Sequence, residues 1–152
     1  MLHYGLTSAD LCDPDRSSRL FVNCGRDMEI ALATTSRDGT KIAEPVEAAT
    51  LGTIRHNQID VVIIDPFVSS HRVPENDNGD IDLVAKRWAS IANSSGAAVE
   101  LVHHVRKLTG AEAAIEEARG GSALMAAARS GRALSRMTKP EAARFRRRGY
   151  WA

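Results

Sequence analysis

The sequence has few cysteines, few aromatic residues and no long apolar run, and each shortage excludes a class of protein. Cys12 and Cys24 lack CxxC spacing, so the chain has no disulfide framework, and its other residues show no zinc signature. No apolar run approaches the ~20 residues that a membrane-spanning helix needs. Aromatic residues make up 5% of the chain, so the core must consist mainly of Val, Ile, Leu and Ala.

Charge and length also limit the kinds of partner and the number of domains that the chain can have. The formal net charge is +1, so any polyanionic partner must be recognised by a local cluster rather than by an overall field. The first residues have neither the basic start nor the apolar block of a signal peptide, and we expect a reduced, cytoplasmic protein. A chain of 152 residues predicts a single domain over 1–152, with a basic tail over 138–152.

The most informative stretch is DVVIIDPFVSSHR, residues 60–72. Its four consecutive β-branched residues predict a central strand of a parallel sheet, covered on both faces. The strand ends on Asp65, and a carboxylate is costly to bury unless a cation or hydrogen bonds meet it. Two interpretations stay open: Asp65 faces a magnesium ion or its water shell, or it caps the following turn.

The remaining pattern predicts an α/β fold with a mainly parallel sheet flanked by helices. Asp38-Gly39 indicates a tight turn, and the polar segments 73–80 and 106–121 indicate loops. We expect strands over 19–23, 29–34, 97–105 and 132–137, and helices over 7–13, 44–57, 80–95 and 122–131.

Two histidines end the strand predicted over 97–105. Successive side chains of a strand point to opposite faces, so His103 and His104 cannot enter the same pocket. One ring should pack or bond to backbone while the other reaches a ligand at the strand end. A small metal-dependent hydrolase that uses Asp65, His71 and His104 is one alternative.

Glycines and arginines follow in ARGGSALMAAARSGRAL, residues 118–134. Gly120 and Gly121 allow a tight turn into a helix. Arg129 and Arg132 would share a helical face if the helix continued that far. Such arginines either form a solvated basic surface or reach a phosphate, for which the planar guanidinium is suited.

In this order, the three motifs resemble those of the RecA-like P-loop ATPases, with the RepA-type hexameric replicative helicases and related AAA-type ATPases of phages and plasmids as the nearest group. VVIIDP resembles a Walker B strand, which implies that Asp65 holds the magnesium of bound ATP. LVHHVRK resembles the strand that senses the γ-phosphate, which assigns that role to His104. The resemblance makes Arg129 the arginine finger, with Arg119 or Arg132 as substitutes, and extends over about residues 1–138.

The segment RKLTGAEAAIEEARGGSAL, residues 106–124, resembles the loop that faces single-stranded DNA in the central channel of these helicases. The resemblance therefore implies contacts from Arg106 and Lys107 to DNA, a role in DNA replication or helicase activity, and a hexamer in full-length relatives.

One part of the family pattern is missing. The Gly-rich loop GxxxxGK[ST], which cradles the phosphates, does not occur in this sequence, and RDGTK at 37–41 lacks its spacing. We therefore expect the chain to correspond to the C-terminal part of a RecA-like core, without its N-terminal strand and P-loop. ATP and Mg²⁺ would bind once an upstream segment or a complementary N-terminal fragment supplied that loop, and the chain alone should hydrolyse little or no ATP.

A different class of function stays open. The chain could be a non-catalytic oligomerisation or single-stranded DNA-binding module that uses Arg106, Lys107 and the arginines of 144–148. The missing strand should also leave a sheet edge with poorly shielded apolar residues, here Val62, Ile64 and Val102, so we expect self-association.

Overall fold

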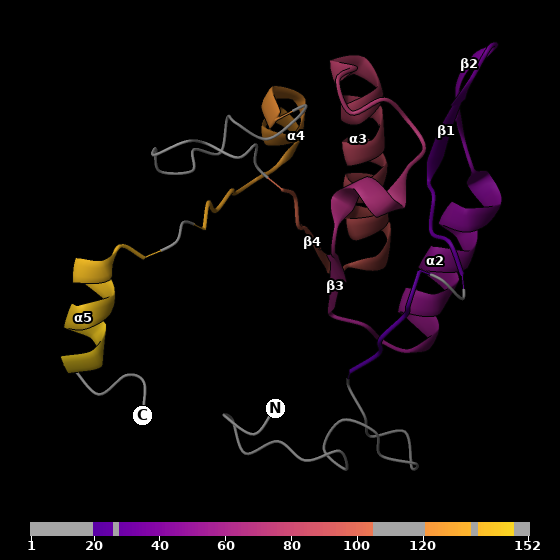
Figure 1. Ribbon diagram of the computed structural model, residues 1–152. Helices are drawn as coiled ribbons and strands as arrows, with labels where there is room; N and C mark the ends of the chain where they lie inside the picture. Colours follow the sequence, from indigo (N-terminus) through magenta and orange to yellow (C-terminus); the bar gives the residue numbers. More distant parts are fainter. Residues whose placement is uncertain (1–19, 26–27, 105–120, 135–136, 148–152) are drawn as a thin grey trace.

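The computed structural model of the chain describes residues 20–25, 28–104, 121–134 and 137–147 (Figure 1). Helices and two small sheets alternate along the chain, which confirms the α/β class. None of the helices in these residues is both long and apolar enough to cross a lipid bilayer. The elements are β1 (Ala33–Ser36), β2 (Gly39–Ile42), α2 (Glu44–His56), β3 (Val61–Ile64), the 3-10 turn η2 (Phe67–Ser70), α3 (Asn78–Ser95), β4 (Ala98–Leu101), α4 (Gly121–Ala127) and α5 (Lys139–Arg147).

Strands β3 and β4 pair in parallel and are joined through α3, so the predicted strand–helix–strand unit is confirmed. The register runs from Val61 opposite Ala98 to Ile64 opposite Leu101. Alternate side chains of both strands pack against the core, as expected for a pleated sheet with one covered face.

Helix α3 supplies the largest part of that core. Its buried side chains are spaced at three and four residues, as the amphipathic pattern predicts. The Asp77 carboxylate begins the helix by accepting hydrogen bonds from the Gly79 and Asp80 amides at 2.9 and 3.1 Å. Gly96 ends it with φ 77°, a left-handed conformation that glycine adopts easily. The buried residues of α3 are Ile81, Val84, Ala85, Trp88 and Ile91.

The hairpin β1–β2 confirms the turn predicted at Asp38-Gly39, and Gly39 has φ 100°. Backbone hydrogen bonds fasten the hairpin to the segment after β3: the Leu32 amide donates to the Ser70 carbonyl at 2.8 Å, and the Arg72 amide to the Ala33 carbonyl at 2.7 Å. The strand expected over 29–34 therefore begins later, at Ala33. Helix α2 follows with Pro45 in its first turn, as predicted.

The expectation of one mainly parallel sheet is wrong for the described residues. They form two sheets of two strands, of which β1–β2 is antiparallel. The strand β3 is also not covered on both faces, because Val61 and Ile63 are 54% and 61% exposed. The exposed apolar residues are thus not the three expected, because Val62, Ile64 and Val102 are half-buried, and Val62 and Ile64 pack against the core. We call the side of β3 and β4 that carries Val61, Ile63, Ala98 and Glu100 the open face.

Two further strand predictions are wrong where the structure describes them. Residues 20–23 and 132–134 have no regular secondary structure, and Val22 and Leu134 are 85% and 91% exposed. Neither segment has a partner strand to satisfy its backbone. The helix predicted over 122–131 forms as α4 but ends at Ala127. The helix predicted over 7–13 and the loop residues 106–120 lie outside the described residues.

The two faces of β3 predict different costs for the same substitution. Val61→Thr should change the free energy of unfolding by no more than about 0.5 kcal/mol, because its side chain is already largely in water. Val62→Thr should lower it by about 1–2 kcal/mol, because the hydroxyl enters the packed face. Urea unfolding followed by Trp88 fluorescence measures both, and equal costs would contradict the assignment of the two faces.

Candidate functional site

Asp65 follows β3 directly at the carboxyl edge of the parallel pair, where ligands bind in open α/β sheets. Its carboxylate is exposed and has no hydrogen-bond or ion-pair partner among the described residues. The turn η2 begins after Pro66 without any side-chain cap, so the interpretation of Asp65 as a capping residue is not supported. An unpartnered carboxylate at this position can meet a cation.

The pairing of the two strands continues past their last residues. The Val102 amide donates to the Ile64 carbonyl at 2.9 Å, and the Phe67 amide donates to the Val102 carbonyl at 2.7 Å. These two bonds enclose the chain at Asp65 and hold it beside the segment that leads out of β4.

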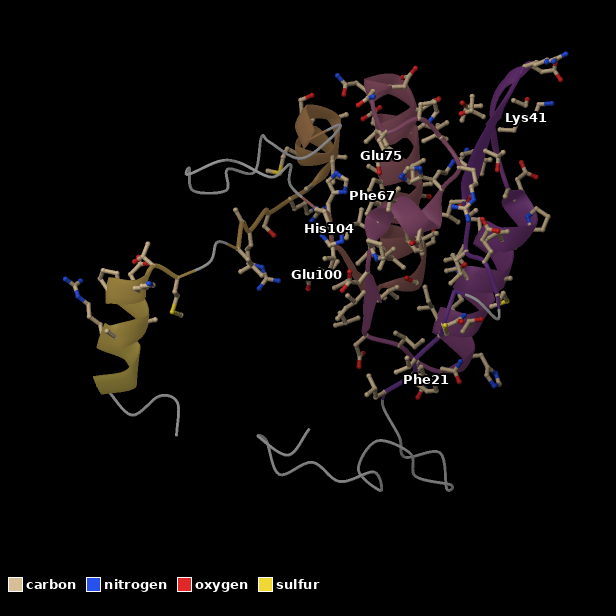
Figure 2. All side chains as sticks on the ribbon, viewed as in Figure 1. Phe21, Lys41, Phe67, Glu75, Glu100 and His104 are labelled. Carbon is tan, nitrogen blue, oxygen red and sulfur yellow. The ribbon has the colours of Figure 1, made fainter. Side chains whose placement is uncertain are left out.

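The two histidines after β4 have different surroundings. The ring of His103 is half-buried and meets the edge of Phe67, with ring centroids 5.9 Å apart. His104 is exposed (Figure 2). Asp65 directly follows β3 and, by alternation from Ile63, lies on the open face. The strand predicted over 97–105 is shorter than expected, because β4 ends at Leu101, three residues before His104. Both Asp65 and His104 therefore lie beyond the carboxyl ends of the paired strands, and both are exposed.

The arginines predicted to reach phosphate have different surroundings in the structure. Arg132 forms an ion pair with Glu100 of the open face, with 2.8 Å between Nη2 and Oε1. Arg129 is exposed and has no partner among the described residues. The two do not share a helical face as expected, since α4 ends at Ala127. Arg106, Lys107 and Arg119 lie outside the described residues.

His71 is not part of this edge. Its side chain is 2% exposed, and its ring packs on Phe67 with centroids 4.9 Å apart. Nδ1 accepts a hydrogen bond from the Val73 amide at 3.4 Å, and the buried Nε2 has no partner in the described part of the chain. Burial in these apolar surroundings lowers the pKa of His71.

Phe67 is a residue of this edge that the sequence pattern did not indicate. This residue is 1% exposed, bonds to the β4 chain through its amide and contacts both His71 and His103 through its ring. One signal was available: a large aromatic residue stands two positions after the aspartate, in a chain with only three phenylalanines. Such a side chain at a strand end tends to be buried.

The available donors suit some metal ions better than others. Within residues 20–25, 28–104, 121–134 and 137–147, no group of three or more His, Cys, Asp or Glu side chains could hold a metal ion. A hydrolase site made of Asp65, His71 and His104 is therefore not supported, and His71 is buried away from solvent. Magnesium in nucleotide sites needs only one or two carboxylates, because water and phosphates complete its shell. Asp65 fits that requirement.

Comparison with known proteins places this edge in a family. A family model described as an AAA domain matches residues 5–110, which include β1 to β4, Asp65 and His104. The chain belongs to the AAA domain family. Comparisons with curated proteins and with solved structures gave no match. The AAA family is one of P-loop ATPases that use nucleotide and Mg²⁺ and generally oligomerise. Arg129, Arg132 and α5 lie outside the matched residues.

The buried imidazole predicts a pH dependence of stability. In the unfolded chain His71 titrates near its ordinary pKa of about 6.5, whereas the folded pKa is lower. Below about pH 6.5 the unfolded state therefore binds more protons, and the free energy of unfolding should fall as the pH decreases. Chemical unfolding at a series of pH values should show a weaker dependence for His71→Gln than for the wild type.

His56→Gln is the matched control for this measurement, because His56 is exposed near the end of α2. It should keep the pH dependence of the wild type. The assignment fails if His71→Gln and the wild type lose stability in parallel as the pH is lowered.

Proposed function

We propose that this chain supplies the β3 and β4 side of the nucleotide site of an AAA-type ATPase. The observation that carries the proposal is the unpartnered, exposed Asp65 at the carboxyl edge of two parallel strands, next to the segment that bears His104. The AAA domain match over these strands supports it.

Asp65 would take the role of a Walker B aspartate and hold magnesium through its water shell. The ion, when bound, neutralises charge that develops on the phosphates during transfer. The Asp65 carboxylate would orient that shell, and His104 would donate a hydrogen bond to the γ-phosphate. The exposure of His104, in contrast to the half-buried His103, supports this role.

Arg129 would reach the nucleotide of a neighbouring subunit as the arginine finger. The structure supports this choice over Arg132, because Arg132 is engaged with Glu100 while Arg129 is exposed and unpaired in the described residues. Arg119 remains a substitute. The finger would neutralise transition-state charge, an effect worth several orders of magnitude in GTPases.

The sequence lacks the Gly-rich phosphate loop, so this edge is one half of a site. We propose that an upstream segment or a complementary fragment supplies the loop, and that the whole has a RecA-like core of the RepA type. Val61 and Ile63 on the open face support this, since their exposed side chains could be covered by the missing strand and helix. DNA replication or helicase activity, a hexameric state and contact of Arg106 and Lys107 with single-stranded DNA belong to this proposal.

A second candidate function is a non-catalytic oligomerisation module. The exposure of Val61 and Ile63 favours it as well, because two copies could bury these side chains against each other.

The proposal predicts that the purified chain with ATP and Mg²⁺ releases no phosphate above background. Mixing it with a fragment of a complete relative that carries the Gly-rich loop should produce hydrolysis. Asp65→Asn should then reduce the rate by about 100-fold, the scale expected for loss of one electrostatic contact at the reacting phosphate. A coupled phosphate-release assay measures each step.

Asp38→Asn serves as the control, because Asp38 lies in the exposed turn of the β1–β2 hairpin and its carboxylate pairs with the exposed Lys41. It should leave hydrolysis unchanged. The catalytic proposal would be overturned by equal rates for the two variants. Fast hydrolysis by the chain alone would show that the missing loop is not required, and failure of every loop-bearing fragment would favour the oligomerisation module.

A further inference from the structure

Helix α5 has no role in the proposed nucleotide site. It covers Lys139–Arg147, whereas the AAA domain match ends at residue 110. In Figure 1 it stands apart from the two sheets, α2 and α3. Its residues up to Arg144 are exposed except for Ala142, which is half-buried. Because the described side chains from Lys139 to Arg144 bury so little apolar surface, this part of the helix must gain its stability locally or from a partner.

The start of α5 shows how the sequence stabilises it locally. Thr138 and Glu141 form a capping box: the Thr138 amide and hydroxyl donate to the Glu141 carboxylate at 2.7 and 2.8 Å, and the Glu141 amide donates to the Thr138 hydroxyl at 3.4 Å. These hydrogen bonds from Thr138 favour the ionised carboxylate and lower the pKa of Glu141. The sequence thus specifies a separate helix at this point in the chain.

Positive charge is concentrated in the C-terminal segment that contains α5, residues 139–152, which we call the arm; residues 1–138 are the body. Of the 20 basic and 19 acidic residues, residues 139–152 contain five basic ones and a single acid, Glu141. Residues 1–138 therefore carry 15 basic and 18 acidic residues, and the near-neutral total conceals an acidic body with a strongly basic arm. The basic residues of the arm are Lys139, Arg144, Arg146, Arg147 and Arg148.

The composition of the arm distinguishes between possible polyanionic partners. Within α5 the apolar side chains are Ala142, Ala143 and Phe145, which is little apolar area for insertion of this helix at a membrane surface. Four of the arm's five cations are arginines, whose planar guanidinium groups bind phosphate oxygens in pairs. Basic arms next to a less basic body are typical of backbone contacts to nucleic acid.

We propose that α5 forms a nucleic-acid-binding arm that contacts the phosphate backbone without reading base sequence. The site does not depend on nucleotide binding at Asp65, nor on Arg106 and Lys107. Residues 128–134, which include Leu134, are exposed, and α5 stands apart from the two sheets in Figure 1.

The test uses the full chain and a fluorescein-labelled oligothymidylate, with binding followed by fluorescence anisotropy over a range of salt concentrations. The triple variant R144Q/R146Q/R147Q keeps good helix formers and should reduce affinity at low salt at least about 10-fold. It should also reduce the slope of log K against log salt by about 2, the value for loss of three contacts to a single strand. Glu141→Gln retains a capping box and should bind more tightly than the wild type.

The matched control is R37Q/K41Q/K86Q, which removes three exposed charges from the body. It should keep the salt slope of the wild type and most of its affinity. The two triple variants should unfold at the same urea concentration, because neither alters the core.

The arm is ruled out as a nucleic-acid site if its variant binds like the wild type, or if the body variant loses as much affinity. It is also ruled out if the wild type does not bind the oligonucleotide. Self-association that disappears in the arm variant and at high salt would then identify the acidic body of a second copy as the partner.

Discussion

The candidate site depends on two backbone hydrogen bonds at the ends of β3 and β4. The Val102 amide bonds to Ile64, and the Val102 carbonyl accepts from Phe67, so the parallel pairing persists after both strands end. Asp65 lies between the two bonded positions and cannot move far from β4. Because parallel strands end at the same edge, a polar residue after each one reaches the same region of solvent. The proposed nucleotide site therefore depends first on this backbone pairing and only then on the properties of the individual side chains.

Phe67 determines which histidines near the strand ends are packed in the core. Its buried ring contacts His71 and His103, and it thereby fills the core side of the strand ends. The imidazole of His104 makes no such contact and is exposed, as is Asp65. Covering the open face requires surface from outside the described residues, whether it comes from a phosphate-binding segment or from another copy. The basic arm at α5 lies apart from this edge, so nucleotide and nucleic acid would occupy separate parts of the chain.

Local pattern predicted the parts of the fold that local physics determines. The amphipathic spacing from Ile81 to Ile91, the Asp38-Gly39 turn and the strand–helix–strand unit are all present. The wrong expectations concerned long-range cover: Val61 and Ile63 have the composition of a buried strand, but burial depends on what packs against them, which composition does not encode. For the same reason Phe67 was overlooked, since its importance arises from contacts between segments distant in sequence. The position of Asp65 directly after β3 could be anticipated because strand ends are a local property, whereas the strand predicted over 97–105 ends at Leu101, three residues before His104. The roles of both residues remain a proposal.

The most direct test of this account is the proximity of Asp65 and His104. A nitroxide label attached at Asp65→Cys, with Cys12 and Cys24 replaced by serine, broadens the NMR signals of nearby nuclei and spares distant ones. The account predicts that the imidazole signals of His104 broaden strongly, while those of His56 at the end of α2 stay sharp. Equally sharp signals from both rings would show that the two strand ends do not meet at one edge.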